Sequence, residues 1–437
     1  MKLPARELRQ LAAVAVFAFA LAACGPDHEG GSAFIGTAPN PPPPPVPVCS
    51  QQSIVGIDPL NNVGYVPVFK QDASGNAQVA VVDLTVGAAD PVLATLVIPG
   101  ARRSIGIGYD PLHKTMLDEV DLTAGGVALA VIDTTTKTVS GSTVSLAGLT
   151  YADHFGGLIE NPVLKQAIVA GTADVGLLDT SVNPPVWDAA SVITTNGTDS
   201  FALNLVTGIL FISDDGATQI IDTGKTPWNP LTFAGGFDIS DGVAFDLATN
   251  VMVLTPEGGK DQAWAFNFAT LNTAVSPATA DSVLVPGLGE AGLLGEGPGG
   301  AVAINCTTHQ AVVADERDGA NFKLLQLPAA PVVGALNNNG QPGGGTVADA
   351  ASAYTIAAAQ IPQGLVDGTL TNLGTGLDPH SIAIDPARNL LYTTAHSGNS
   401  EFLVQVDLSK PVLGASPTGG VDGTTFWNPT GTAIPLP

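Results

Sequence analysis

A pattern of paired apolar runs, repeated seven times, constrains the fold of this 437-residue chain more than any other feature. In each copy a first run ends in Asp or Asn, and a second run that ends in a polar residue follows 18 to 25 residues later. The first runs end at Asp58, Asp110, Asn161, Asn204, Asp246, Asn305 and Asp385, and the second runs at Asp83, Asp133, Asp179, Asp222, Asn267, Gln326 and Asp407. Periods of about 40 to 50 residues with about four strands each are typical of β-propellers. The pattern predicts an all-β chain, a β-propeller of seven blades with four antiparallel strands each.

The last copy shows the strands of one blade most clearly. Residues 381–385, 390–394 and 402–408 are rich in β-branched and aliphatic side chains, and the turns P-A-R-N and H-S-G-N-S separate them. Apolar runs bounded by such turns are typical of antiparallel strands. Residues 432–437 resemble residues 95–100, so we expect them to form the outer strand of the final blade.

The letters of this copy resemble the blade consensus of the YVTN and NHL-type propellers. The matching stretches are D-P-H-S-I-A-I-D-P at 378–386, L-Y-T-T at 391–394 and L-V-Q-V-D at 403–407, and Y-V-P-V at 65–68 is the next closest. That superfamily includes lactonases, lyases and proteins that only bind. The resemblance supports the fold over about residues 51–437 and leaves the activity open, because function depends on sites built onto a fold.

Residues 1–23 have the pattern of a bacterial lipoprotein signal peptide. Three basic residues precede the apolar residues 11–20, and the run L-A-A-C that ends at Cys24 resembles the lipobox, whose Cys is lipidated after cleavage. An ordinary secretory signal with a chance Cys is the alternative. Gly25 in place of Asp resembles lipoproteins of the outer membrane, so we expect a cell envelope protein anchored there.

Residues 24–50 form a Gly-, Ser- and Pro-rich tether after the lipidated Cys. The Pro-rich stretch 39–47 favours an extended spacer that would hold the domain some tens of Å from the membrane. Removal of residues 1–23 leaves 12 Lys and Arg against 38 Asp and Glu, a net charge of −26. This charge excludes nucleic acid as a partner and favours cations.

Cys49 and Cys306 are the two thiols that remain after Cys24. An oxidising compartment favours a disulfide between them. Their positions argue against one, because Cys49 precedes the first strand whereas Cys306 follows an inner strand, at what we expect to be the opposite face. The sequence therefore leaves undecided whether the two Cys form a disulfide.

Propeller geometry predicts that acids gather on one face. The loops between second and third strands, and those between blades, should lie together; they include the acids of residues 118–121 and the residues Asp153, His154, Asp378 and His380. His154 and His380 precede the first strands of the third and seventh blades. They and the two Asp are our candidate ligands for Ca²⁺ or another divalent cation. The alternative is that these residues only cap turns.

The recurring turn residues and a break in the period are two further features of the sequence. The Asp and Asn that recur in most copies are expected to form turns, and His113 and His309 should lie on the face opposite the candidate ligands. Residues 329–376 interrupt the period as an insertion, which either covers the channel mouth or forms a degenerate eighth blade. Within it, residues 348–363 suit a short helix or an outer strand.

Two functions remain. We favour a lipid-anchored, non-enzymatic binding scaffold for an envelope protein, a glycan or a cation. The alternative is a metal-dependent, lactonase-like hydrolase or lyase with its site at the channel mouth. No G-x-S-x-G, phosphate-binding loop or H-E-x-x-H motif is present. Few Lys or Arg lie in the candidate loops, which disfavours an enzyme for phosphorylated sugars.

Overall fold

The computed structural model describes the residues that form the sheets and many of the turns between them. These are residue 49 and residues 55–68, 70–85, 90–150, 157–198, 200–213, 218–234, 239–257, 264–284, 301–314, 321–327, 355–360, 377–397, 400–409 and 432–436. Residues 46–437 form one compact unit and residues 1–45 another. The predicted signal peptide, Cys24 and most of the predicted tether lie outside the described residues. No helix among the described residues is long and apolar enough to span a membrane.

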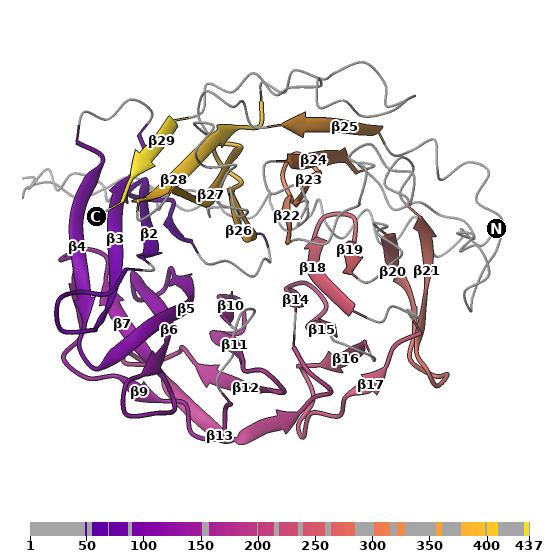
Figure 1. Cartoon of the computed structure of the whole chain (residues 1–437). Helices are drawn as coiled ribbons and strands as arrows, with labels where there is room; N and C mark the ends of the chain where they lie inside the picture. Colours follow the sequence, from indigo (N-terminus) through magenta and orange to yellow (C-terminus); the bar gives the residue numbers. More distant parts are fainter. Residues whose placement is uncertain are drawn as a thin grey trace, which may run out of the picture. The chain divides into compact units, whose positions relative to one another are not determined.

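The described residues form antiparallel sheets, numbered here in chain order (Figure 1). Sheet 1 contains β1 (Gly56–Asp58), β2 (Val63–Val68), β3 (Ala77–Asp83) and β4 (Val92–Ile98). Sheet 2 contains β5 (Ala101–Asp110), β6 (Thr115–Leu122), β7 (Val127–Asp133), β8 (Thr138–Val139) and β9 (Val144–Ser145). Sheet 3 contains β10 (Gly157–Asn161), β11 (Gln166–Ala170), β12 (Asp174–Asp179) and β13 (Val186–Thr194).

The second half of the chain continues the same order. Sheet 4 contains β14 (Ser200–Asn204), β15 (Ile209–Ser213), β16 (Gln219–Asp222) and β17 (Leu231–Thr232). Sheet 5 contains β18 (Ile239–Asp246), β19 (Val251–Glu257), β20 (Trp264–Asn272) and β21 (Thr279–Leu284). Sheet 6 contains β22 (Val302–Asn305), β23 (Gln310–Ala314), β24 (Asn321–Gln326) and β25 (Thr355–Gln360). Sheet 7 contains β26 (Leu377–Asp385), β27 (Leu390–Ser397), β28 (Ser400–Asp407) and β29 (Thr432–Pro435).

This arrangement is an all-β β-propeller built from antiparallel, mostly four-stranded sheets, as the sequence predicts. In the described part of the chain, six sheets have four strands and sheet 2 has five. Both β8 and β9 pair with β7, so the two short strands share the outer position of their sheet. The first strands lie nearest the centre of the ring and the fourth strands lie at its rim (Figure 1).

The recurring Asp and Asn form the turns between first and second strands, as predicted. Each of the seven accepts hydrogen bonds on its side chain from backbone N–H groups two or three residues later. The fourth residue after each one has a positive φ; these residues are Asn62, Lys114, Lys165, Gly208, Asn250, His309 and Asn389. Short polar side chains support such turns by binding their own backbone. The recurrence is therefore a requirement of the fold.

A second recurring contact ties each of these turns to the end of the third strand. In all seven sheets, the residue after the polar residue that ends the second run donates its backbone N–H to the carbonyl of the positive-φ residue, for example Leu84 to Asn62 and Leu408 to Asn389. The near-constant spacing of the paired runs in the sequence follows from this contact. We call the end of the ring that carries the first-to-second and third-to-fourth strand turns the repeat face. The opposite end, with the second-to-third strand turns such as 70–76, 123–126 and 171–173, is the connection face.

Neighbouring sheets are held together by buried apolar side chains. Separate hydrophobic clusters lie between sheets 1 and 2, 2 and 3, 3 and 4, and 4 and 5. The cluster between sheets 4 and 5 is aromatic, with Phe245 and Phe268 edge to face at a centroid distance of 4.9 Å. No single sheet buries both of its faces, so the ring is stable only when each sheet packs on its neighbours.

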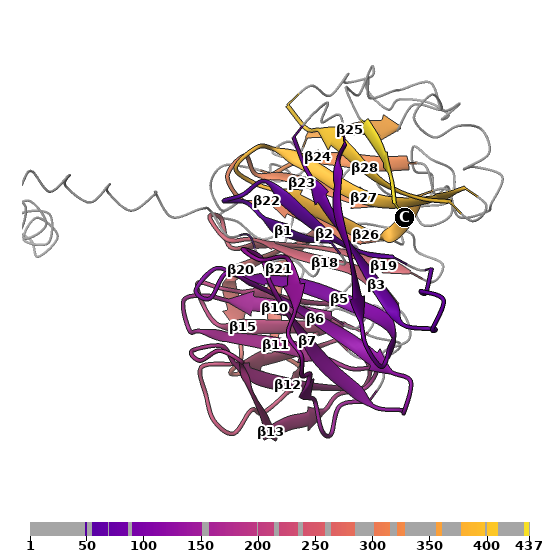
Figure 2. The same ribbon diagram turned by 90° about the vertical axis from the view of Figure 1, so that its left-hand side faces the viewer.

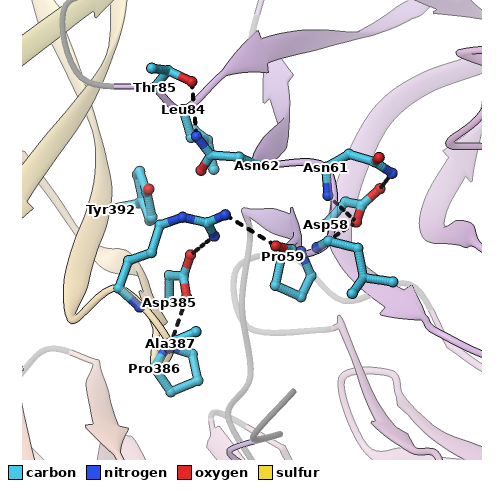
Figure 3. A network of polar contacts seen from close by, with 12 residues as sticks. Asp58, Pro59, Asn61, Asn62, Leu84, Thr85, Asp385, Pro386, Ala387 and Tyr392 are labelled. Carbon is cyan, nitrogen blue, oxygen red and sulfur yellow. Dashed lines mark hydrogen bonds and ion pairs between the residues drawn. The ribbon is translucent and has the colours of Figure 1, made fainter. Parts of the chain in front are cut away.

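The ring closes through packing of the last sheet on the first, which share a cluster that includes Val66, Leu84 and Tyr392. Gln405 Nε2 donates to the carbonyl of Leu84 at 2.9 Å. Figure 3 shows the closure at the repeat face, where the Arg388 guanidinium joins two groups. It donates to Asp385 Oδ2 at 2.6 Å and to the carbonyl of Pro59 at 3.2 Å. Among the described strands, none is exchanged between the first and last sheets, since each sheet pairs only strands that are consecutive in the chain.

Cys49 and Cys306 form a disulfide, with their Cα atoms 5.6 Å apart. Cys306 follows β22 directly, in the first turn of sheet 6, so the bond lies at the repeat face. The expectation that Cys49 lies at the opposite face is therefore wrong. The position of a residue relative to the first strand does not determine its face, because the six residues between Cys49 and Gly56 are enough to cross from one face to the other.

The two distal segments supply outer strands. Residues 355–360, within the predicted insertion, pair with β24 as β25, so the strand interpretation of that stretch is correct. The predicted outer strand at the C-terminal end is β29, which pairs with β28. The remainder of residues 329–376 lies outside the described residues.

Candidate functional site

The predicted metal ligands are only partly within the described structure. Asp153 and His154 lie outside the described residues. Asp378 and His380 belong to β26, but only their backbone is described. Among the described residues, no group of three or more His, Cys, Asp or Glu could hold a metal ion. The metal site therefore stays a prediction.

The acids of residues 118–121 lie in β6 and not in a loop, contrary to the sequence prediction. The turn that follows β6 comprises residues 123–126. Asp118 and Glu119 are completely buried, and Asp121 is 2% exposed. The prediction failed because turn-forming residue types were taken to mark the turn, whereas here they continue a buried strand.

Asp118 and Glu119 depart from the repeat. The fourth residue after the positive-φ residue is aliphatic in five other sheets and Thr in one; the seven residues are Val66, Asp118, Val169, Ile212, Leu254, Val313 and Thr393. The fifth residue is small or Pro in every other sheet; the seven are Pro67, Glu119, Ala170, Ser213, Thr255, Ala314 and Thr394. The fold therefore does not require an acid at either of these two positions.

Asp118 is held in a neutral environment between sheets 1 and 2. Ser104 Oγ donates a 2.5 Å hydrogen bond to Asp118 Oδ1, while Oδ2 has no partner among the described residues. Burial raises the pKa of Asp118 to about 8, and the bond from Ser104 offsets this only in part. A carboxyl group in such a site is protonated at neutral pH and can donate a hydrogen bond.

Glu119 points to the other side of β6, toward sheet 3. Neither of its carboxyl oxygens makes a hydrogen bond of normal geometry to a described residue. Burial raises the pKa of Glu119 well above its usual value, and the negative charges of Asp118 and Asp174 raise it further. The backbone N–H of Gly157 lowers it only in part. These nearby negative charges favour the protonated form of Glu119, because they would repel a charged carboxylate there.

Asp174, the first residue of β12, is the better satisfied partner of this pair. Its carboxylate accepts bonds from the Thr150 backbone N–H at 3.1 Å and from Thr150 Oγ1 at 2.9 Å. Burial still raises the pKa of Asp174. A Cβ at Gly171 would lie 2.3 Å from Asp174 Oδ1, so only Gly leaves room for this carboxylate.

We call Asp118, Glu119 and Asp174 the buried-acid cluster. Asp118 faces sheet 1 and Glu119 faces sheet 3, whereas Asp174 begins β12 at the connection face. Sheets 2 and 3 are neighbours in the ring (Figures 1 and 2). On the adjacent surface, the Arg102 side chain is half exposed and pairs with Asp121. Asp118 and Glu119 are completely buried, so these two carboxyl groups do not reach the solvent.

A third unpaired acid lies elsewhere. Glu160 in β10 occupies the position before the turn residue, where the other sheets have Ile57, Tyr109, Leu203, Phe245, Ile304 and Ile384. Burial raises the pKa of Glu160, and the charge of Asp110 raises it further. It lies near the repeat face and does not belong to the buried-acid cluster.

The two histidines that the sequence placed on the opposite face both have carboxylate partners there. His113 Nδ1 lies 2.7 Å from Asp110 Oδ2, and His309 Nδ1 lies 2.8 Å from Asp246 Oδ2 of the preceding sheet. Both pairs belong to the turns of the repeat face, so the sequence analysis left them out of the candidate site correctly.

The buried-acid cluster was missed in the sequence although a signal for it existed. An alignment of the seven copies on their turn residues shows acids at the eighth and ninth positions after the turn residue only in the second copy. Recurrence then separates turn acids from the others. The electrostatic effect of Asp174 on Glu119 required the tertiary structure.

Comparisons with known proteins add little to this picture. No family model matches the chain, and no curated protein matches it. Similar solved structures include a chain of the "Crystal Structure of Mitotic Checkpoint Complex", at 11% identity and a TM-score of 0.48 over 85% of this chain and 94% of that one. The β-propeller domain of Cps50 (Swd1) from Myceliophteria thermophila is similar at 11% identity and a TM-score of 0.49, over 83% of this chain and 98% of that one. At such identities, neither structure bears on what this chain binds.

Proposed function

We propose that this chain is a lipid-anchored, seven-bladed propeller of the cell envelope that acts as a non-enzymatic binding scaffold. Its ligand would be an envelope protein, a glycan or a cation, bound at the connection face. The blade count treats β8 and β9 as one interrupted outer strand of sheet 2. The lipid anchor rests on the L-A-A-C run at Cys24, and the outer membrane location on Gly25.

One observation carries the proposal: no repeat position requires the acids Asp118 and Glu119 of β6, the strand that leads to the connection-face turn 123–126. Burial of an unpaired carboxyl group opposes folding. Departures from local rules that cost stability are expected at functional sites. The seven recurring Asp and Asn of the repeat face, in contrast, are explained by their turns.

Site-specific photo-crosslinking in the native cells tests the proposal. A photoreactive residue would replace Ala124, an exposed residue in the turn after β6. The matched control is Thr307, an exposed turn residue of sheet 6 on the repeat face. We expect discrete protein or glycan adducts from position 124 that are absent from position 307. Equal adducts from both positions, or none from 124, would contradict the proposal.

The hydrolase or lyase alternative is distinguished by metal content. Elemental analysis of the mature protein before and after chelation, with the melting temperature, reports whether a metal is bound in stoichiometric amount. A bound metal that is lost when His154 and His380 are both changed to Ala would favour the enzyme and a screen of lactone substrates. A melting curve unaffected by chelator would favour the scaffold.

A further inference from the structure

The exposed aliphatic side chains are concentrated on one face of the ring. Among the described residues, ten large apolar side chains are strongly exposed; they are Leu60, Leu93, Val97, Leu112, Val163, Leu164, Val182, Val186, Val206 and Val275. Leu93 and Val97 belong to the outer strand β4. The other eight lie in the turns of the repeat face or, for Val186, on the first residue of the strand that leaves such a turn. Exposed apolar residues that gather on one face indicate an interaction site, whereas scattered ones do not.

Five of these residues occupy the turns between first and second strands of sheets 1 to 4. We call Leu60, Leu112, Val163, Leu164 and Val206 the apolar arc; their exposed fractions are 47%, 50%, 74%, 46% and 73%. In three of these turns the Asp or Asn side chain accepts the backbone N–H of the arc residue two positions later. The turn therefore fixes the backbone of these residues and leaves their side chains in solvent.

The turn itself does not require an aliphatic side chain. The equivalent residues in sheets 5, 6 and 7 are Ala248, Thr307 and Ala387, which are also exposed and follow the same capped Asp or Asn. Small or polar residues thus serve the same geometry on the other side of the ring. The requirements of the fold therefore do not explain the large apolar side chains of the arc.

The charge of these turns differs from that of the whole chain, whose net charge is −24. The acids of the turns are buried, with Asp58 and Asp110 0% and 4% exposed. Lys114, two residues after Leu112, and Lys165, directly after Leu164, are exposed. Acids such as Asp133 and Asp179 end the third strands, next to the turns between third and fourth strands. The inner turns thus present aliphatic and basic side chains together, a combination typical of surfaces that contact lipid.

The N-terminal segment starts from the same face. The disulfide holds Cys49 against Cys306, the second residue of the first turn of sheet 6. The preceding 48 residues, which carry the predicted lipid on Cys24, are therefore joined covalently to the repeat face. A tether rooted at this face brings it, and not the connection face, toward an anchoring membrane.

We propose that the apolar arc rests on the surface of the lipid bilayer, with Lys114 and Lys165 at the level of the phosphate groups. The proposal rests on the lipid anchor of the proposed function. Four or five partly exposed aliphatic side chains bind a bilayer weakly on their own, and the anchor supplies the high local concentration that makes the contact persist. The 24 residues between Cys24 and Cys49 set the greatest distance between the lipid and the ring, and a closer approach lies within that limit. The connection face then points away from the membrane, where a ligand reaches it.

A fluorescent probe of local polarity tests this orientation in the full lipidated chain. The Cys49–Cys306 disulfide and the lipid on Cys24 leave no native thiol, so a single new Cys is labelled selectively. The probe is placed by Leu164→Cys in the arc and, as a matched control, by Ala124→Cys on the connection face. The protein is incorporated into phosphatidylcholine vesicles with or without phosphatidylglycerol. We expect a blue shift and quenching by lipid-borne quenchers at position 164 only.

A second variant tests whether the side chains of the arc themselves contact the bilayer or whether position 164 is only close to it. Leu60→Thr, Leu112→Thr, Val163→Thr and Val206→Thr together give the arc the residue that sheet 6 carries at Thr307. We expect an unchanged melting temperature, because these side chains are exposed, and quenching at position 164 reduced to the level of position 124. Unchanged quenching in this variant would overturn the proposal.

The remaining outcomes distinguish the two proposals. Mass analysis of the N-terminal peptide reports the lipid on Cys24, and its absence would overturn the lipid anchor and the membrane contact together. A lipid on Cys24 with both probes in water would overturn only the membrane contact. A dimer in detergent-free solution that the four-Thr variant abolishes would assign the arc to a second copy of the chain instead.

Discussion

The acids of the repeat face and those of the buried-acid cluster have the same residue types and similar burial, but they differ in what surrounds them. Asp58 and Asp385 are fully buried and accept several hydrogen bonds in their turns. Glu119 is equally buried and has no such partner. Burial alone therefore does not show which acids the repeat requires. Recurrence with the repeat does.

The disulfide should make the largest single contribution at the repeat face. It joins residues 257 positions apart. Closure of so long a loop restricts the unfolded chain strongly, and removal of such a bond costs about 3–5 kcal/mol. We expect the Cys49→Ser, Cys306→Ser double variant to lose that stability in urea unfolding. A similar loss on reduction of the wild type, and none on reduction of the variant, is the control.

Removal of a recurring acid should have the next largest effect. Asp246 accepts bonds from the Ala248 backbone N–H at 3.2 Å and from Thr249 Oγ1 at 2.8 Å, and it pairs with His309. Asp246→Ala leaves these donors unpaired in a buried site, and we expect a loss of about 2–4 kcal/mol in the free energy of unfolding. Asp246→Asn should lose less, because Asn204 and Asn305 serve the same turn. Equal losses in both variants would show that charge, and not the turn, matters here.

Replacement of Asp118 should increase the free energy of unfolding, by an amount that depends on pH. The pKa of Asp118 is about 8 in the folded protein and about 3.9 in an unfolded chain. Between these values the folded state holds the proton more tightly, so the contribution of Asp118 to stability is lost as the pH rises from about 4 to about 8. Asp118→Asn keeps an oxygen for Ser104 and does not titrate. We expect the variant to match the wild type near pH 4 and to exceed it by about 1–3 kcal/mol at pH 8, measured by thermal unfolding across the pH range. A constant difference would contradict the raised pKa.

Glu160→Leu should give the smallest change of the four. It restores the apolar side chain of the equivalent positions, and a leucine fills that position in sheet 4 as Leu203. Replacement of a buried acid without a charge partner by an apolar residue is expected to stabilise by about 1–2 kcal/mol at neutral pH. Urea unfolding at pH 7 measures the effect. Glu160→Gln is the matched control for loss of charge without gain of apolar surface, and a destabilised Glu160→Leu would argue that this acid has an undetected partner.

Much of the fold was predictable because the turns repeat. The spacing from Asp58 to Asp83 and its counterparts reflects one hydrogen-bonded contact between the first turn and the end of the third strand, so it persists while the intervening letters vary. The outer strand β29 was predicted from the resemblance of residues 432–437 to residues 95–100. For the stretch that contains β25, a helix and a strand were both open, because Ala favours a helix whereas Thr and Ile favour a strand, and only the pairing with β24 decided between them.

The candidate site was less predictable for a physical reason. The acids of β6 were placed in a loop, because Asp and Glu are rare inside strands and residue type outweighed position in that inference. The predicted face of Cys49 was also wrong, because that face depends on the path of a segment outside the repeat. A local sequence pattern does not give that path.

The sequence by itself predicted the repeated units and the residues that form their turns. These depend on contacts within about 25 residues, as between Asn62 and Leu84. The tertiary structure decided that the charge of Asp174 acts on Glu119, that Cys49 meets Cys306 and that the apolar arc shares a face with that bond. These juxtapositions arise only when the sheets close into a ring, because they bring together residues from different blades.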